Sequence, residues 1–333
     1  MKSRRLLIPG ILVLLILVAF PLIIRSSFAM HLLSLIFFYT ALTSAWNIPV
    51  YGGKVSLGHA AFFGLGGYTA AILYVNYGVS PWLGLLASIM VACLGGLIVS
   101  LPLIRLKGPF FTLASIAFAE VCRLVAIDWR SLTNGSVGIN IPFRPSVWNL
   151  TFQSSEPFYY ISFLLAVIVT LISWKLRTSA LGYHLKAAAS DDEAARALGV
   201  NTNRVHFVAF MWSSGLTGLI GGLYGFYVYV IEPHTMFSLT LFSLQPALNG
   251  IIGGLGTVAG PVIGSIIMTP LGEFMRFYLG SIQQGLNFVV YGFVLIVTVI
   301  FIPGGIYSLA RDWLTRRTGN GPADQRGKAH DAA

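Results

Sequence analysis

Residues 81–104 read PWLGLLASIMVACLGGLIVSLPLI, a run of 24 residues without one charged side chain. A helix needs about 20 predominantly apolar residues to cross a bilayer, so this run predicts a membrane-spanning helix. The rest of the 333-residue chain has the same character, with 56% apolar residues, 10% charged residues and a mean hydropathy of +0.79. A soluble domain carries roughly 25% charged residues. The composition therefore excludes a soluble globular enzyme, a coiled coil and a disordered chain.

The apolar runs predict an all-α polytopic membrane protein with about ten transmembrane helices, in the range of eight to ten. The runs lie at 6–24, 29–50, 57–75, 81–104, 109–128, 157–175, 206–231, 241–257, 261–280 and 285–309. Two of them, 57–75 and 241–257, are short and rich in glycine, so we expect broken or re-entrant helices there. The first run follows Lys2, Arg4 and Arg5, which is also compatible with a signal peptide. Its length exceeds that of a signal-peptide core and favours an uncleaved helix.

The basic residues predict the orientation of the chain. With a cytoplasmic N-terminus, ten spans place both termini inside, and 16 of the 21 Lys and Arg residues fall on that side. The other five are Arg25, Arg123, Arg130, Arg144 and Arg276. This bias follows the positive-inside rule and accounts for the net charge of +10 without nucleic-acid binding. We expect a single transmembrane domain over 1–315, an outer loop at about 129–156, a cytoplasmic loop at about 176–205 and a disordered cytoplasmic tail at 316–333.

The sequence lacks the common motifs of ATP-binding, metal-dependent and nucleophilic enzymes. It contains no GxxxxGK[ST] loop for ATP, no HExxH metal motif and no GxSxG nucleophile elbow. The six histidines lack metal-ligand spacing. The sequence therefore predicts no catalytic residue, no metal and no cofactor of its own. An ion-driven carrier needs several charges inside the membrane, whereas the predicted spans hold only Glu120 and Glu273, with Asp128 at an edge.

The predicted cytoplasmic loop contains its own short helix. Residues 187–204 read AAASDDEAARALGVNTNR, and Ser190 with Glu193 matches the capping box that starts a helix. The acidic residues between them favour the positive end of the helix dipole, and Gly199 is suited to end a helix of about nine residues. Such a helix is either a connector on the membrane surface or a docking site for a cytoplasmic partner. Because the chain has no ATP site, a partner ATPase is the natural candidate.

Several stretches carry a family resemblance. The pattern Glu193-Ala194-Ala195 followed by Gly199 resembles the coupling loop of ABC importer permeases, where the loop docks into the nucleotide-binding subunit. Further stretches are SAWNIPVYGGKVSLGHAAFFGLGGYTAAI at 44–72, KGPFFTLASIAFAEVCRLV at 107–125, TNGSVGI at 133–139 and GIIGGLGTVAGPVIGS at 250–265. Together they resemble the permeases of branched-chain amino acid ABC importers, of the Liv type and its M subunit, over roughly 35–310.

This resemblance implies a bacterial inner-membrane permease that makes a heterodimer with a homologous permease. Two cytoplasmic ATP-binding subunits and a periplasmic solute-binding protein are its expected partners, with ATP bound by the partners alone. The sequence leaves open whether the solute is a branched-chain amino acid, urea, a short amide, a sugar or another small polar molecule. A self-sufficient secondary carrier is a further alternative. The chain departs from the family at Lys54, often Gln, at Asn134, often Gly, and at Ala189–Ser190, where a basic residue is common. The expected coupling residues are Ser190, Asp191, Asp192, Glu193, Ala194, Ala195, Arg196 and Gly199.

Glycine clusters and a few polar residues are candidates for the translocation path. The clusters Gly52–Gly53 and Gly253-Gly254-x-Gly256 predict broken helices, which at membrane depth occur only inside the protein or beside a water-filled cavity. Small residues four apart, as in Gly218-x-x-x-Gly222 and Gly221-x-x-x-Gly225, equally predict close helix packing. Glu120 and Arg123 are spaced to pair on one helix face, as a structural pair, a solute contact, a gate or a subunit contact. The candidate path residues are Asn47, Ser56, His59, Tyr68, Glu120, Arg123, Asn249, Gly253, Gly254 and Gly256.

Overall fold

A computed structural model describes residues 17–21, 26–103, 106, 108–279, 292 and 304–309. Within these residues the chain is helical apart from one two-stranded sheet, which confirms the all-α class. The long helices are α2 (Ser27–Val50), α3 (His59–Tyr77), α4 (Pro81–Leu103), α5 (Pro109–Asp128), α7 (Glu156–Thr178), α10 (Thr202–Val228) and α13 (Ala259–Leu279). The short elements are α6 (Arg130–Thr133), η1 (Gly135–Val137), β1 (Ile139–Asn140), η2 (Val147–Asn149), α8 (Ala180–Ser190), α9 (Asp192–Ala197), β2 (Val230–Ile231), α11 (Pro233–Met236), η3 (Thr240–Leu244) and α12 (Gln245–Gly253).

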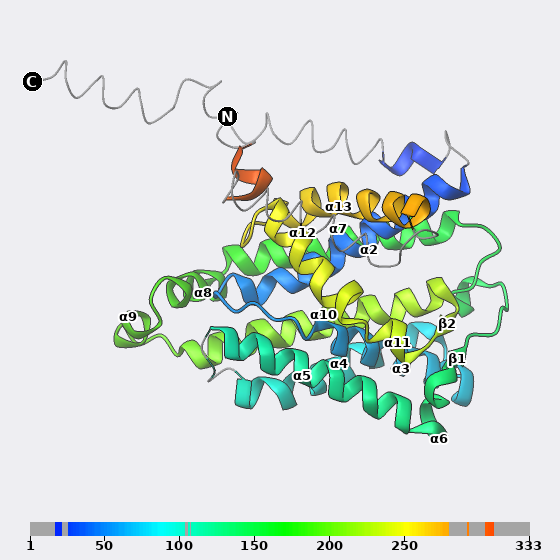
Figure 1. The fold of residues 1–333 in the computed structure, drawn as a ribbon, viewed down its shortest axis with the longest axis horizontal. Coiled ribbons are helices and arrows are strands. Elements are labelled where there is room, and N and C mark those ends of the chain that lie inside the picture. The colour runs from blue at the N-terminus through cyan, green and yellow to red at the C-terminus, as the bar shows by residue number, and fades with distance from the viewer. Residues whose placement is uncertain are drawn as a thin grey trace, which may run out of the picture.

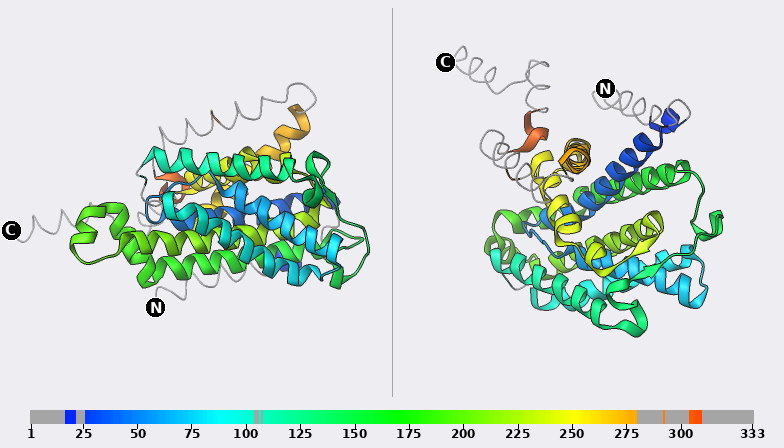
Figure 2. Two further views of the ribbon diagram at one scale, coloured as in Figure 1. Left: turned by 90° about the horizontal axis from the view of Figure 1, so that it is seen from below. Right: turned by 45° about the vertical axis from the view of Figure 1, so that its right-hand side comes forward.

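The long helices lie side by side in two groups. One group holds α3, α4, α5 and α10, and the other holds α2, α7, α12 and α13, with α10 packed against α2 between them (Figure 1, Figure 2). The helices α8 and α9 extend from one end of the bundle, and α6, β1 and β2 lie at the opposite end (Figure 1). We call these the α9 end and the β1–β2 end. Among the described residues, the α9 end carries the basic side chains Lys54, Lys175, Arg177, Lys186, Arg196 and Arg204.

Six helical segments are long and apolar enough to cross a membrane. They are Ser27–Val50, Pro81–Ser100, Pro109–Asp128, Glu156–Thr178, Thr202–Val228 and Pro233–Gly253. The expected break within 57–75 is wrong, because α3 is one continuous helix. The run predicted at 241–257 is broken as expected, and its span starts earlier, at 233, from the succession α11, η3 and α12. The runs predicted at 6–24 and 285–309 fall mainly outside the described residues, and the tail 316–333 falls wholly outside them.

Close packing of backbones holds the α3–α10 pair together. A Cβ atom added at Gly66 would lie 2.0 Å from the carbonyl oxygen of Gly218, and one added at Gly221 would lie 2.1 Å from the carbonyl oxygen of Phe63. Helices in lipid associate through such close contacts because burial of apolar side chains gives little advantage there. The predicted small-residue interfaces of α10 are therefore confirmed, and they explain why the glycines of α3 do not interrupt it.

The loop at the β1–β2 end is tied to the rest of the fold. Strand β1 pairs with β2 in antiparallel register, Ile139 opposite Ile231, so this loop is fixed to the connection between α10 and α11. Asn134 has a φ of 62° and donates from Nδ2 to the Gly138 carbonyl at 2.8 Å. Asparagine tolerates the left-handed conformation better than most residues. This explains how Asn134 can stand where the family that the sequence resembles often carries glycine.

Candidate functional site

The helix α9 begins one residue later than the sequence predicts. Asp191 is its N-cap, and its Oδ1 accepts from the backbone N–H groups of Glu193 and Ala194, each at 3.0 Å. Ser190 is the last residue of α8, and its hydroxyl donates to the Lys186 carbonyl at 3.1 Å. The predicted Ser190 cap is therefore wrong, and the helix has six residues rather than about nine. The reason is that α8 runs directly into the extended backbone of Asp191, which leaves Ser190 inside the preceding helix.

The helix α9 ends as the sequence predicts. Gly199 has a φ of 87°. Its N–H donates to the Arg196 carbonyl at 2.9 Å, and the Val200 N–H reaches back to the Ala195 carbonyl at 3.1 Å. These two bonds form a Schellman motif, in which a left-handed residue satisfies the last carbonyl groups of a helix. Gly199 therefore stops α9 and redirects the chain into α10.

Arg196 ties α9 to the start of α10. Its guanidinium lies 2.9 Å from the Asp192 carboxylate, and its Nε donates to the Thr202 hydroxyl at 2.9 Å. A further bond reaches the Asn203 side chain at 3.2 Å. Burial acts to raise the pKa of Asp192, but bonding to Thr202 and the charge of Arg196 outweigh it and hold that pKa below its usual value. The carboxylate therefore stays ionised and paired at neutral pH.

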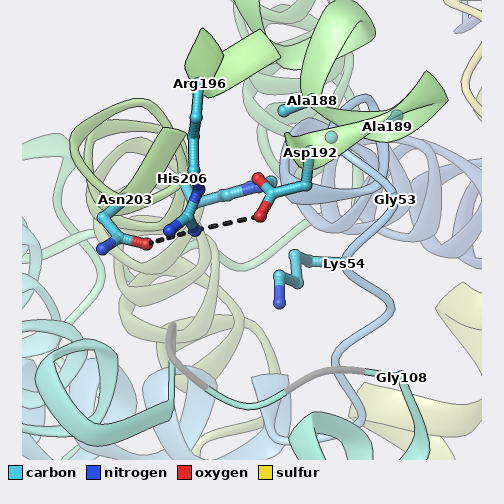
Figure 3. A pocket seen from close by; sticks show the side chains of 10 residues that line it. Gly53, Lys54, Gly108, Ala188, Ala189, Asp192, Arg196, Asn203 and His206 are labelled. Atoms are coloured by element: carbon cyan, nitrogen blue, oxygen red, sulfur yellow. Dashed lines mark hydrogen bonds and ion pairs between the residues drawn. The ribbon is translucent and has the colours of Figure 1, made fainter. Parts of the chain in front are cut away.

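A cavity of about 230 Å³ lies between this loop and the turn that follows α2. Asp192, Arg196 and Asn203 point toward one another on its loop side, and Lys54 extends from the turn on the other side (Figure 3). Lys54 donates from Nζ to the Leu106 carbonyl at 2.6 Å. The residues lining the cavity are Gly52, Gly53, Lys54, Gly108, Ala188, Ala189, Asp192, Arg196, Asn203 and His206.

The turn after α2 is in direct contact with the loop. A Cβ atom added at Gly52 would lie 2.7 Å from both His206 Cε1 and Leu185 Cδ2. Leu185 of α8 and His206 of α10 are both buried. Sequence reasoning missed His206, since nothing in its spacing distinguishes it from other histidines. At Gly52 the turn therefore packs directly against α8 and α10, beside the cavity.

Asn47 joins α2 to the glycine-rich segment between α12 and α13. We call residues 254–257 the glycine break. The fully buried Asn47 side chain donates from Nδ2 to the Thr257 carbonyl at 2.7 Å and accepts from the Gly256 N–H at 3.1 Å. Gly254 and Gly256 have φ values of 126° and 66°, a region that favours glycine. The structure thus brings together three candidate path residues: Asn47, Gly254 and Gly256.

Gly253 and Asn249 lie where α12 crosses α13. A Cβ atom added at Gly253 would lie 1.9 Å from the Gly260 carbonyl oxygen, and one added at Gly264 would lie 1.8 Å from the Asn249 carbonyl oxygen. Asn249 is buried and donates from Nδ2 to the Ser265 hydroxyl at 3.3 Å. Its Oδ1 has no hydrogen-bond partner among the described residues. Gly253 therefore serves close packing between the two helices.

The candidates Ser56, His59 and Tyr68 are buried and bonded inside the protein. Nε2 of His59 lies 2.7 Å from the Ser213 hydroxyl, which itself donates to the Ala45 carbonyl at 2.7 Å. This chain of bonds links α3, α10 and α2. Ser56 accepts a bond within its own loop, and Tyr68 donates to a carbonyl of β2. All three are less than 5% exposed, and their contacts hold helices and loops together.

Glu120 and Arg123 form the predicted pair on α5. Arg123 donates from Nε to the Glu120 carboxylate at 2.9 Å and makes a second bond to its other oxygen. A third group, His234 of α11, lies with its Nδ1 3.2 Å from Arg123 Nη1. The Glu120 side chain is 52% exposed. Sequence reasoning missed His234, which lies more than 100 positions away along the chain.

Among the described residues no group of three or more His, Cys, Asp or Glu side chains could hold a metal ion.

Comparisons with known proteins give the family. Residues 28–299 match the family described as the permease component of the branched-chain amino acid transport system. The chain is 23% identical to the high-affinity branched-chain amino acid permease LivM of Salmonella typhimurium, over 94% of this chain and 77% of that protein. It is 26% identical to LivH of the same organism, over 80% and 90%, and 26% identical to the autoinducer 2 permease LsrC of Photorhabdus luminescens, over 42% and 43%. No solved structure matches the chain. The relatives are transport permeases rather than enzymes, and the chain belongs to the branched-chain amino acid transport permease family.

Proposed function

We propose that this chain is the membrane-spanning permease subunit of an ABC importer for branched-chain amino acids. It pairs with a homologous permease, two cytoplasmic ATP-binding subunits and a periplasmic solute-binding protein in a bacterial inner membrane. ATP is bound and hydrolysed by the partners. The observation that carries the proposal is a capped helix, α9, at the end of a membrane bundle from a permease family. The LivM and LivH relatives, both named for branched-chain amino acids, support the choice of solute.

The α9 end faces the cytoplasm in this proposal. Its six described basic side chains fit the positive-inside rule. With the runs at 6–24 and 285–309 as further spans, about ten helices cross the membrane and both termini lie inside. The β1–β2 end then faces the periplasm, where the ordered loop at 129–155 is placed to meet a solute-binding protein.

The contacts at the α9 end suggest how partner motion reaches the membrane helices. A force on α9 passes to α10 through the bonds of Arg196 to Thr202. It passes to α2 through the contact of Gly52 with Leu185 and His206. Because Asn47 lies on α2 and holds the glycine break, movement of α2 alters the backbone at the break. We place the coupling residues at 190–199 and the inner gate at the break.

Glu120 and Arg123 indicate where a second permease packs. Glu120 is the twelfth residue of the 20-residue α5 and half exposed, and its outward neighbours on the helix include Leu113, Val121 and Leu124. A charged side chain facing lipid near the bilayer centre costs about 2.5–3.5 kcal/mol on insertion scales. Protein or water must therefore cover this face. We propose that a second permease covers it and that the pair lines the solute path at the seam, where it meets the ammonium and carboxylate groups of the amino acid.

Paired charge removal tests this role of Glu120 and Arg123. Glu120→Gln and Arg123→Gln each leave one charge without its partner, so both single variants should lose uptake. If the pair contacts the solute, the double variant stays impaired, with a raised KM for leucine, while the complex assembles. If the two charges only neutralise each other, the double variant regains uptake, and the role in the solute path is refuted. Leu124→Ala on the same face is the control for lost packing alone.

Co-expression with the genomic neighbours tests the function as a whole. The tagged chain should co-purify with an ATPase, and vesicles containing the complex should take up labelled leucine only when ATP is inside. A complex that hydrolyses ATP but ignores leucine would shift the solute to urea, a short amide or another small polar molecule; the LsrC relative, named for autoinducer 2, keeps that alternative open. Solute movement by the chain alone on an ion gradient would refute the ABC proposal in favour of a secondary carrier.

A further inference from the structure

A second cavity, of about 310 Å³, lies at the α9 end on the side of α7 and α8. Its polar lining comes from Tyr51, Arg177, Thr178, Tyr183 and Lys186. It is bounded where α7 ends at Thr178 and α8 begins at Ala180. It is separate from the cavity of Figure 3 and from the proposed path residues except at one position, Gly256, which also lines it.

The cavity is positively charged. Arg177 and Lys186 are exposed, the lining contains no carboxylate, and no carboxylate of the described residues makes an ion pair with either of them. In the other cavity, by contrast, Asp192 offsets the charge of Arg196. Two cations around one hollow, with no carboxylate partner among the described residues, favour an anion with several acceptor oxygens, such as a phosphate group.

Arg177 is held in position before any ligand arrives. Its guanidinium lies 5.8 Å from the centre of the Tyr51 ring. Tyr51 is itself 7% exposed and bonded through its hydroxyl to Ser173 at 2.7 Å. The start of α8 closes tightly over the end of α7, since a Cβ atom added at Gly182 would lie 2.1 Å from the Arg177 carbonyl oxygen. A preset cation loses little conformational freedom on binding.

Aromatic side chains place this cavity at the level of the lipid headgroups. Tyr183 lines the cavity and is 68% exposed, and Trp174, three residues before Arg177 on α7, is 54% exposed. Exposed Trp and Tyr side chains are typical of the membrane–water boundary, and basic pockets between helices on the cytoplasmic side bind phosphate headgroups. We propose that this cavity binds the phosphate of an anionic membrane phospholipid. The proposal rests on the cytoplasmic placement of the α9 end in the proposed function.

The lipid site is adjacent to the proposed inner gate. Gly256 lines the cavity, and its N–H is one of the two groups held by Asn47. A headgroup bound between Arg177 and Lys186 therefore lies in a cavity that the glycine break borders at Gly256. The expected consequence is greater thermal stability of the assembled transporter in membranes that contain anionic lipid.

The test uses the assembled complex in nanodiscs of phosphatidylcholine with or without phosphatidylglycerol. Lipid retention is measured by native mass spectrometry, and stability by thermal unfolding. Arg177→Gln with Lys186→Gln should weaken phosphatidylglycerol retention about 30-fold, because each basic residue near an anionic surface contributes about a fivefold step. The control, Lys175→Gln with Arg204→Gln, removes the same charge from the same end outside the cavity. It should retain the lipid.

Each of three outcomes would overturn the proposal. Equal weakening in the control would mean unspecific attraction to the surface. Equal stabilisation by inorganic phosphate in detergent would mean a free-anion site instead of a lipid site. Loss of the ATPase subunit from the double variant would mean that the cavity is a partner contact. Arg177→Lys is the control for misfolding, since it keeps the positive charge and should still bind phosphatidylglycerol. Retention is measured without transport, so failure of leucine uptake would refute the proposed function alone.

Discussion

Replacing Asn47 tests whether α2 controls the glycine break. Asn47→Ala removes a fully buried side chain that bonds the Gly256 N–H and the Thr257 carbonyl. Asn47→Asp keeps the volume and the acceptor for Gly256 but loses the donor and faces the Thr257 carbonyl with a carboxylate oxygen. Both variants should therefore loosen the break, although only the first leaves a cavity.

The burial of the two bonded backbone groups gives the size of the expected effect on the gate. An unsatisfied buried backbone group costs about 1–3 kcal/mol, and because Gly256 and Thr257 are only half-buried, we take about 1 kcal/mol for each. Two groups then give about 2 kcal/mol. If that energy favours the closed gate, its loss shifts the ratio of closed to open states by about 30-fold, since 1.4 kcal/mol is a factor of ten.

The assay is leucine efflux from preloaded proteoliposomes without ATP, together with the thermal midpoint of the complex. Both variants should lower the midpoint and raise the leak, by up to about 30-fold in Asn47→Ala, which loses both bonds. An unchanged leak in both variants would refute the gating role of the break. A lower midpoint in Asn47→Ala alone would show that lost volume matters and that the two hydrogen bonds do not.

Three further predictions concern α9 and the α12–α13 crossing. Asp191→Ala should cost about 1 kcal/mol of α9 stability as a lost N-cap and speed amide exchange over 192–197, whereas Ser190→Ala should leave exchange unchanged. Gly264→Ala should lower the thermal midpoint and reduce assembly on size exclusion, because its Cβ would meet the Asn249 carbonyl oxygen at 1.8 Å. The Asp192 pKa is lowered on folding, so α9 protection should hold above about pH 4, where the unfolded carboxyl is already ionised, and be lost as the pH falls further.

Each of these three predictions has a result that would contradict it. Equal exchange in the Asp191 and Ser190 variants would contradict the observed cap. A fully stable Gly264→Ala complex would mean that α12 and α13 separate at no cost. Protection of α9 that begins to fall near pH 6 would assign its pH dependence to a group other than Asp192.

The sequence alone was sufficient for the membrane class, most span positions and the family. These properties depend on local features, such as an uncharged run at 81–104 or a glycine after an alanine-rich segment, and each can be detected within a window of about 20 residues. The pairing of Glu120 with Arg123 was predictable for the same reason, since three residues separate neighbours on one helix face. Ser190 failed as a cap although its pattern fitted the local rule, because in the structure it is the last residue of the preceding helix α8.

Only the tertiary structure decided which candidate residues meet. Asn47 and Thr257 are 210 positions apart, and their contact depends on how α2, α12 and α13 rotate about their axes, which apolar periodicity does not specify in helices buried on several sides. The same holds for His206 against Gly52 and for His234 beside Arg123. Burying a polar group without a hydrogen-bond partner costs free energy. Which group becomes that partner depends on how helices distant in the sequence pack together.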